Sequence, residues 1–273
     1  MATVSLHPTS AASNSLWSGT VRVLRSGARD AATNMALDEA MLLTAADTGD
    51  TLVRLYQWER ASVSFGRNQR CNGIYSSERC KAHGVPAVRR LTGGRALVHA
   101  REVTYAVAAP TAVAATLRGG YEAINDVLLA ALHSLGIGAQ RAAPTERMAA
   151  PGLAPCFEAP ATGELVVDGR KIVGSAQHRD ATAFLQHGSI LLADDQLILH
   201  DLAMVSLPEV ASPATLWSLR PDVSAEQLMD ALTASVRAAA NGDIVVTMDT
   251  DLLSHGVEGL ATRYRDPLWT WRR

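Results

Sequence analysis

Lysine is nearly absent from this 273-residue sequence. Lys81 and Lys171 are the only two, and arginine supplies the other basic residues. Arginine stays charged at any accessible pH, so it cannot serve where a group must lose its proton. Either lysine is therefore an unusual choice in this chain, and a well-placed one is a candidate for chemistry.

Cysteine is also scarce, and long apolar runs are missing. The three cysteines, Cys71, Cys80 and Cys156, are odd in number and match no metal-ligand spacing. No segment approaches the roughly 18 uninterrupted apolar residues of a membrane span, and the N-terminal segment lacks the basic and apolar regions of a signal peptide. These absences predict a cytoplasmic protein with free thiols, no metal and no membrane association.

An excess of one charge sign is missing as well. The formal net charge is −2, with 48% apolar and 19% charged residues. This composition excludes wholesale disorder, and it gives no reason to expect sequence-independent binding to nucleic acid. The length allows a substantial core. We predict a flexible tail over residues 1–19 and a single catalytic domain over residues 20–273, with no accessory C-terminal domain.

Periodicity predicts an α+β fold in which mixed and antiparallel sheets pack with helices. Asp168-Gly169 fits the type I′ turn of a hairpin, Ser224 and Gln227 form a capping box, and Gly136 ends a helix. The Ala/Pro-rich segment Ala139–Pro155 is expected to be a mobile loop. We expect helices over 32–47, 76–83, 119–137 and 224–242, and strands over 51–60, 61–69, 96–100, 102–110, 163–177 and 181–194.

The segment RRLTGGRALVH, residues 89–99, places three arginines around a Gly-Gly turn. No Gly-Lys-Ser/Thr follows, so it is not a phosphate-binding P-loop. Arg89, Arg90 and Arg95 can be solvated surface charges, but their grouping favours a negative or carbonyl-bearing ligand. His99 follows in the next strand and is a weak candidate for catalysis.

Three further segments combine reactive and small residues. Cys156 lies between Pro155 and Phe157 in the segment APCFEAP. It is either a buried apolar side chain or a nucleophile. Lys171 precedes the small run GSAQ, residues 174–177, and is either a solvated strand residue or a side chain facing a ligand. His187, in the segment HGS, is either structural or catalytic. Cys71 and Cys80 are expected to be structural.

In combination, VRRLTGGRALVHAREVTYAV, GRKIVGSAQHRDATAFLQHGSILL and ATRYRDPLWTWRR resemble the biotin/lipoate protein ligase superfamily. The resemblance covers about residues 20 to 270, and the segment PCFEAPATGELVVDGRKIVGSAQ is most similar to its cysteine-dependent octanoyltransferases. Two positions depart from the family pattern: Gly163 replaces an aromatic residue, and Arg95 follows the two glycines where ligases usually have a third.

The resemblance implies a transfer reaction in lipoate biosynthesis and protein lipoylation. Octanoate would pass from acyl carrier protein to Cys156 as a thioester, assisted by Lys171, and then to a lysine of a lipoyl domain such as the glycine cleavage H protein or a dehydrogenase E2. No cofactor is required. The substrate-binding candidates are Arg90, Thr92, Gly93, Gly94, His99, Gly174, Ser175, Ala176, His187 and Gly188.

The acyl chain needs an apolar tunnel, which we expect between the helix segment Ile124–Leu135 and the strand at Phe184 and Leu185. Two other functions remain open at this point. One is an ATP-dependent lipoate-protein ligase, or an amidotransferase acting between lipoyl domains. The other is a non-catalytic scaffold that binds acyl groups or lipoyl domains.

Overall fold

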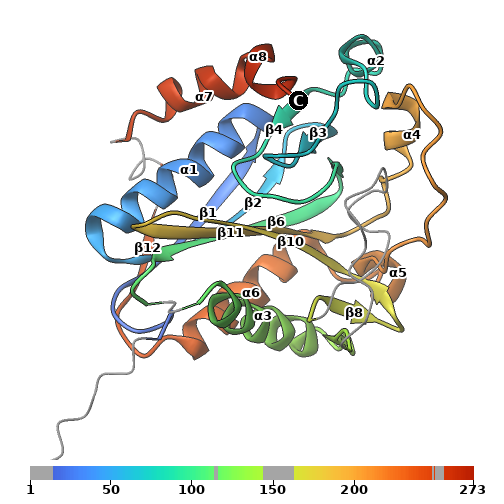
Figure 1. Ribbon diagram of the computed structural model, residues 1–273. Helices are drawn as coiled ribbons and strands as arrows, with labels where there is room; N and C mark the ends of the chain where they lie inside the picture. Colours follow the sequence, from blue (N-terminus) through green and yellow to red (C-terminus); the bar gives the residue numbers. More distant parts are fainter. Residues whose placement is uncertain (1–14, 114–115, 144–162, 248, 250–254) are drawn as a thin grey trace, which may run out of the picture.

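The computed structural model describes residues 15–113, 116–143, 163–247, 249 and 255–273. The predicted α+β class is confirmed (Figure 1). The helices are α1 (Ala31–Thr48), α2 (Ser77–Ala82), α3 (Leu117–Ser134), α4 (Ile198–Leu202), α5 (Leu216–Leu219), α6 (Ala225–Ala239), α7 (Val257–Arg265) and α8 (Pro267–Thr270). The strands are β1 (Val21–Arg29), β2 (Thr51–Trp58), β3 (Ser62–Phe65), β4 (Ala87–Arg89), β5 (Leu97–His99), β6 (Glu102–Pro110), β7 (Gln140–Arg141), β8 (Leu165–Val167), β9 (Arg170–Lys171), β10 (Val173–Arg179), β11 (Ala183–Leu191) and β12 (Ile244–Thr247).

A six-stranded mixed sheet forms the centre of the molecule, in the order β10-β11-β6-β2-β1-β12. Strand β1 pairs in parallel with β2 and β12, whereas the other neighbours are antiparallel. Helices α1 and α7 cover one face, and α3 and α6 cover the other (Figure 1). A small sheet, β4-β3-β5, lies beside the α1 face and has its own core.

Alternation along β6 separates the two cores. Val103, Tyr105 and Val107 face the α3 and α6 side, whereas Ala106 and Ala108 face the α1 side. Side chains of a strand alternate between the two faces, so polar residues at the even positions of β6 reach the space between the large and small sheets.

Local signals predicted several elements correctly. Helices α1, α3 and α6 lie within a few residues of their predicted ranges, and the Ser224/Gln227 capping box is present. Asp168 and Gly169 both have positive φ, as a type I′ turn requires. The N-cap of α1 is Asp30, whose side chain accepts hydrogen bonds from the N–H groups of Ala32 and Thr33.

Three expectations need correction. Leu16 and Trp17 are buried, at 3% and 6% exposure, so the predicted flexible tail over residues 1–19 extends too far. Gln140–Arg141 form β7, so the predicted mobile loop begins after them; residues 144–155 of that loop lie outside the described residues. The arm predicted after the hairpin divides at Ile172 into β9 and β10, which belong to different sheets.

Candidate functional site

A small cavity lies between the large sheet, the small sheet and the start of α1. Met35, Trp58 and Leu97 supply apolar walls, and the backbone of β10 and β11 closes one side. Seven of the predicted site residues line it: Arg90, His99, Gly174, Ser175, Ala176, His187 and Gly188. The sequence motifs that are far apart in the chain therefore do meet at one cavity.

Hydrogen bonds from the buried Arg90 side chain hold the Gly-Gly loop in place. Arg90 donates to the carbonyl oxygen and hydroxyl of Ser64, at 2.9 and 2.6 Å, and to the carbonyl oxygens of Gly93 and Arg95, at 2.9 and 3.1 Å. Gly94 has φ of 95°, a conformation that favours glycine. Arg90 has a structural role, because its guanidinium fixes the shape of the turn; its binding role stays a prediction.

Arg89 does not reach the cavity, which corrects the expectation that it faces a ligand. Its side chain is fully buried. It donates to the carbonyl oxygens of Thr270 (2.8 Å), Gly66 (2.6 Å) and Gln69 (2.8 Å), and to the sulfur of Cys71 (3.0 Å). Arg89 therefore ties the loop to the C-terminal segment.

Thr92 and His187 belong to a buried chain of hydrogen bonds. The Thr92 hydroxyl lies 2.7 Å from Nε2 of His187, and Nδ1 of His187 lies 2.8 Å from a carboxylate oxygen of Asp38. A carboxylate only accepts, so Nδ1 carries a proton. Asp38 also accepts from Arg54 (3.1 Å) and Tyr56 (2.9 Å). The chain links α1, β11 and the Gly-Gly loop through side chains.

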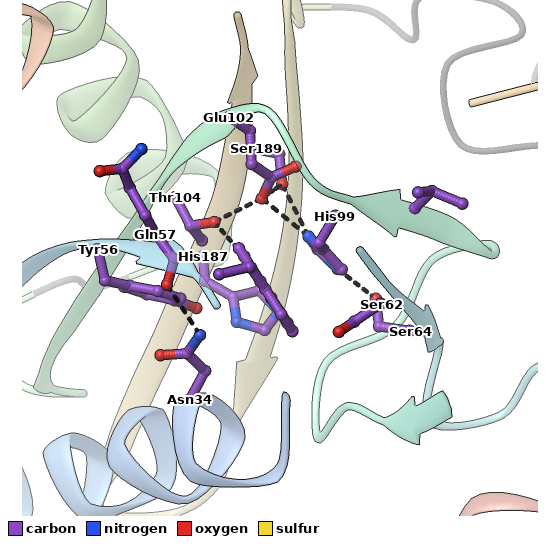
Figure 2. Close-up of polar contacts among 12 residues, drawn as sticks. Asn34, Tyr56, Gln57, Ser62, Ser64, His99, Glu102, Thr104, His187 and Ser189 are labelled. Carbon is purple, nitrogen blue, oxygen red and sulfur yellow. Dashed lines mark hydrogen bonds and ion pairs between the residues drawn. The ribbon is translucent and has the colours of Figure 1, made fainter. Parts of the chain in front are cut away.

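His99 lies in a second buried network, which Figure 2 shows between the two sheets. Its Nδ1 is 2.8 Å from Glu102 and its Nε2 is 2.6 Å from the Ser64 hydroxyl. Burial lowers the pKa of His99, against the opposing effect of Glu102. The neutral imidazole then donates from Nδ1 to Glu102 and accepts from Ser64, with the indole of Trp58 stacked 3.9 Å from its ring.

Glu102 is the centre of this second network. One carboxylate oxygen accepts from His99, Thr104 (2.5 Å) and Ser189 (2.7 Å), as the dashed lines in Figure 2 show. The other oxygen is buried with no partner among the described residues. Thr104 in turn accepts from the Trp58 indole at 2.8 Å. These contacts fix the orientation of the cavity's aromatic wall.

The small residues of β10 and β11 allow the two backbones to lie close to the cavity. A Cβ atom on Gly188 would lie 2.5 Å from the carbonyl oxygen of Gly174 and 2.7 Å from the Tyr105 ring. The Tyr105 hydroxyl is 2.7 Å from that of Ser175 and accepts from Gln186 at 2.8 Å. These hydrogen bonds fix the orientation of the Ser175 side chain.

Lys171 is buried, with its side chain 3% exposed, and its ammonium lies 2.8 Å from the carboxylate of Glu164. The solvated alternative is therefore wrong. Lys171 does not line the cavity described above, but it lies on β9, directly before the strand that does. Cys156 lies outside the described residues. Cys71 and Cys80 are both buried free thiols, as expected.

Gly163, where the family pattern has an aromatic residue, lies against an aromatic ring from another element. A Cβ atom on Gly163 would lie 3.7 Å from the Tyr121 ring of α3. The carbonyl oxygen of Gly163 accepts from Asn125 at 3.0 Å. Tyr121 therefore occupies space beside the segment that leads to Glu164.

The residues expected to line an acyl tunnel pack in the two cores. Ile124, Leu128 and Phe184 pack in the core on the α3 face of the sheet, and Leu185 packs in the core on the α1 side. None of the four lines the cavity, whose lining comes from α1, Arg90 and strands β2, β5, β6, β10 and β11. Helix periodicity correctly identified buried side chains, but it could not distinguish a closed core from a ligand cavity.

Several site residues were missed by the sequence reasoning: Asp38, Arg54, Trp58, Glu102, Glu164 and Ser189. Three of them carried a signal, because a charged residue among apolar neighbours in a helix or strand interrupts the expected pattern. Asp38 in MALDEAML, Arg54 in LVRLY and Glu102 before VTYAV are such interruptions. A buried charge needs a partner, so each pointed to an internal network.

Comparison with protein families identifies relatives over most of the chain. A model described as the lipoyl protein ligase A/B catalytic domain matches residues 30–237. A protein named octanoyltransferase LipM from Kyrpidia tusciae is 42% identical over 182 residues, which are 63% of this chain and 66% of that protein. Proteins of the same name from an Exiguobacterium species and Staphylococcus aureus are 32% and 30% identical, over 93% and 92% of this chain and 99% and 98% of theirs.

Solved structures with the same fold come from more distant proteins. A lipoate-protein ligase A bound with ATP superposes with a TM-score of 0.73 at 20% identity, covering 93% of this chain and 98% of that chain. The bi-partite lipoate protein ligase of Thermoplasma acidophilum, solved in a study of that ligase and its E2 lipoyl domain, gives 0.72 at 19% identity and covers 93% and 96%. At these identities the likeness establishes the fold.

Proposed function

Because this chain belongs to the lipoyl protein ligase A/B catalytic-domain family, we propose that it is an octanoyltransferase of lipoate biosynthesis. It moves an octanoyl group from acyl carrier protein to the lysine of a lipoyl domain, through a thioester on Cys156. The near full-length similarity to proteins named octanoyltransferase supports this reaction over the other activities of the family.

The cavity carries the proposal. Met35, Trp58 and Leu97 give it apolar walls, and burial of a hydrocarbon chain there contributes about 0.8 kcal/mol per CH₂. The small residues of β10 let the acyl head group approach backbone N–H groups, which stabilise the oxyanion in the transition state.

In this mechanism Lys171 supplies the cation that assists the reacting thiol. The carboxylate of Glu164, 2.8 Å away, favours the charged form of the Lys171 amine. A buried ammonium stabilises a thiolate as an ion pair and so makes it available as a nucleophile. This role differs from that of a neutral base, which the burial of Lys171 alone would suggest.

The two half-reactions balance without ATP. The Cys156 thiolate attacks the thioester carbonyl of the donor, the C–S bond to the carrier breaks, and the carrier leaves as a thiol after protonation. The neutral amine of the acceptor lysine then attacks the Cys156 thioester, an amide forms, and the cysteine leaves as thiolate. Conversion of a thioester to an amide is downhill, so no cofactor is needed.

The setting of this reaction follows from its chemistry. The acceptor is a lipoyl-domain protein such as the glycine cleavage H protein or a dehydrogenase E2. A nucleophilic thiol needs a reducing compartment, which supports a cytoplasmic location. Within the described ranges, no helix has the length and apolar character needed to cross a membrane.

The test is incubation of the protein with octanoyl-acyl carrier protein, followed by intact-mass measurement. We expect an octanoyl adduct on the wild type that is lost in Cys156→Ala and formed much more slowly in Lys171→Gln. Subsequent addition of a lipoyl domain should discharge the adduct. Acylation of the lipoyl domain that requires ATP and survives Cys156→Ala would instead identify a ligase, and binding of the lipoyl domain without transfer would identify a scaffold.

A further inference from the structure

Four arginines lie where the C-terminal residues contact residues 67–72. Ion pairs neutralise many other arginines, such as Arg101 by Asp195 and Arg220 by Asp222. In the part of the chain that the structure describes, Arg67, Arg70, Arg272 and Arg273 form no ion pair with any side-chain carboxylate; Arg70, Arg272 and Arg273 are exposed, and Arg67 is half-buried. We call these four residues the arginine cluster.

Backbone contacts bring the members of the cluster together. The Arg272 guanidinium donates to the carbonyl oxygen of Arg67 at 3.2 Å. The carbonyl oxygen of Arg273 accepts from the N–H groups of Cys71 and Asn72, at 2.9 and 3.0 Å, which places Arg273 beside Arg70. The cluster is therefore a surface formed by two segments about 200 residues apart in sequence, residues 67–72 and 269–273.

This surface lies beside the Gly-Gly loop and the end of β10, near the residues that line the cavity. The Arg67 N–H donates to the carbonyl oxygen of Thr92 at 2.8 Å, within the Gly-Gly loop. The Arg67 guanidinium lies 3.3 Å from Nδ1 of His178 on β10, two residues beyond Ala176, which lines the cavity. Gly93 and Gly94 are exposed between these contacts. A group bound at the cluster would thus lie next to one that enters the cavity.

The positive charges in this region repel one another. Partial burial, followed by repulsion from Arg273, Arg67 and Arg263, lowers the pKa of Arg272. Among these, Arg263 is paired with Glu39, whereas no side-chain carboxylate of the described residues pairs with the cluster. A protein with a net charge of −2 therefore concentrates unneutralised positive charge at one edge of its site, where an anionic partner would relieve the repulsion.

We propose that the arginine cluster is the docking surface for the acyl donor: an acidic carrier protein whose acyl thioester hangs from a phosphodiester-linked arm. This inference rests on the proposed function and names the surface that it uses. Guanidinium groups bind phosphate oxygens in a bidentate manner. With the acyl chain in the cavity and the arm passing the Gly-Gly loop, the phosphodiester and the acidic carrier surface lie over the cluster.

The charge of the acceptor argues against the alternative that the lipoyl domain docks here. Its reacting lysine arrives as an ammonium before it loses a proton. The guanidinium groups of the cluster oppose the approach of that cation, since like charges at an interface are disfavoured. The same field attracts the phosphodiester of the donor, so charge separates the two partners of the reaction.

The experiment measures formation of the octanoyl-enzyme adduct from two donors. One is octanoyl-acyl carrier protein, and the other is octanoyl-N-acetylcysteamine, which has the same thioester but neither phosphate nor carrier. The variants are Arg70→Gln, Arg272→Gln and the two combined. Arg237→Gln is the matched control, because it removes the same charge from an exposed position near the end of α6.

We expect the double variant to raise the KM for octanoyl-acyl carrier protein on the order of tenfold. Its rate with octanoyl-N-acetylcysteamine should stay within about twofold of the wild type, and Arg237→Gln should match the wild type with both donors. Added salt should raise the wild-type KM for the carrier donor more than that of the double variant.

Three results would overturn the inference. Equal losses with both donors would show that the arginines shape the site rather than dock the carrier. An unchanged KM for the carrier donor would show that the arginine cluster does not dock the acyl donor. A raised KM for the lipoyl domain alone, in the second half-reaction, would show that the cluster docks the acceptor instead. The absence of an adduct from the wild type with either donor is a separate outcome, because it removes the proposed function as well.

Discussion

At the scale of single residues, Asp38 balances a charge that the fold buries completely. Arg54 is fully buried, and Asp38 accepts from it at 3.1 Å. The same carboxylate fixes the ring of His187, which contacts the Gly-Gly loop through Thr92. A single carboxylate on α1 therefore contributes both to stability and to the position of the loop.

We predict that Asp38→Asn destabilises the protein by about 3–5 kcal/mol, because breaking a buried pair leaves an uncompensated charge. Urea unfolding measures the change. Asp47→Asn is the control on the same helix, since the Asp47 side chain is 69% exposed, and it should change the free energy of unfolding by less than about 0.5 kcal/mol. Equal effects of the two substitutions would contradict the buried network.

His99 makes stability depend on pH in a defined direction. Burial lowers its pKa in the folded state, whereas the unfolded value is about 6.5. Below about pH 6.5 the unfolded chain binds more protons at this position, so stability falls as the pH falls towards the folded pKa. Above pH 6.5 the contribution is constant.

The corresponding prediction concerns His99→Gln. We expect it to lower stability at pH 7.5 by about 1–3 kcal/mol, because Glu102 and Ser64 lose a matched partner, and to reduce the loss of stability between pH 6.5 and 5. Thermal unfolding at several pH values measures this. His200→Gln, on the short helix α4, serves as the control, and an unchanged pH slope in His99→Gln would refute the argument.

At the scale of elements, the Gly-Gly loop depends on close contact with the end of β3. A Cβ atom on Gly66 would overlap the carbonyl oxygen of Gly94 and approach its carbonyl carbon to 2.8 Å. The obstacle is backbone on both sides, so it cannot be removed by a rotamer change. The two segments must separate if Gly66 gains a side chain.

We predict that Gly66→Ala slows octanoyl-adduct formation at least tenfold while it destabilises the protein by about 1–3 kcal/mol. The reason is displacement of the loop that borders the cavity. Gly138→Ala is the control, because a Cβ atom there meets nothing within 4 Å. Adduct kinetics by mass spectrometry and thermal unfolding measure the two effects, and wild-type kinetics in Gly66→Ala would show that the loop tolerates displacement.

Elements with strong local signals could be predicted from the sequence, and those defined by distant partners could not. The capping box of α6 and the Asp168-Gly169 turn are encoded within a few residues. Strand β1 carries arginines at three of its nine positions, and β12 has four residues, so neither has a clear alternating pattern. Pairing makes both of them strands, β1 with β2 and β12, and β12 with β1.

The candidate site shows the same division. The small residues of β10, the HGS segment and the Gly-Gly loop could be placed together through the resemblance. The position of the cavity could not, because periodicity identifies a buried face without saying whether it is filled. Arg89 was misassigned because its acceptor at Thr270 lies 181 residues away, and no local pattern reveals such a contact.

At the scale of the whole molecule, the first described residues close the core on the side away from the cavity. Trp17 is 6% exposed and packs in the core with α3 and α6. Its carbonyl oxygen accepts from Asn241 at 2.9 Å. Residues before β1 and after α6 therefore meet, and they contribute to the same hydrophobic core.

We predict that Trp17→Ala destabilises the protein by about 3–5 kcal/mol, the usual cost of truncating a buried tryptophan. Trp217→Ala is the control, since Trp217 is 37% exposed, and it should cost less than half as much. Urea denaturation measures both. A loss below about 1 kcal/mol for Trp17→Ala would mean that the segment is a dispensable extension, as a flexible tail would be.

The bond between Arg89 and Thr270 also has a consequence for synthesis on the ribosome. The Gly-Gly loop leaves the ribosome long before its acceptor at Thr270, and the Trp269 indole, which donates to the Arg89 carbonyl at 3.0 Å, is 180 residues downstream. Contacts over such separations form late in folding. A nascent chain can build the helices around the site as they emerge, but the loop reaches its final position only when residues 269 and 270 arrive.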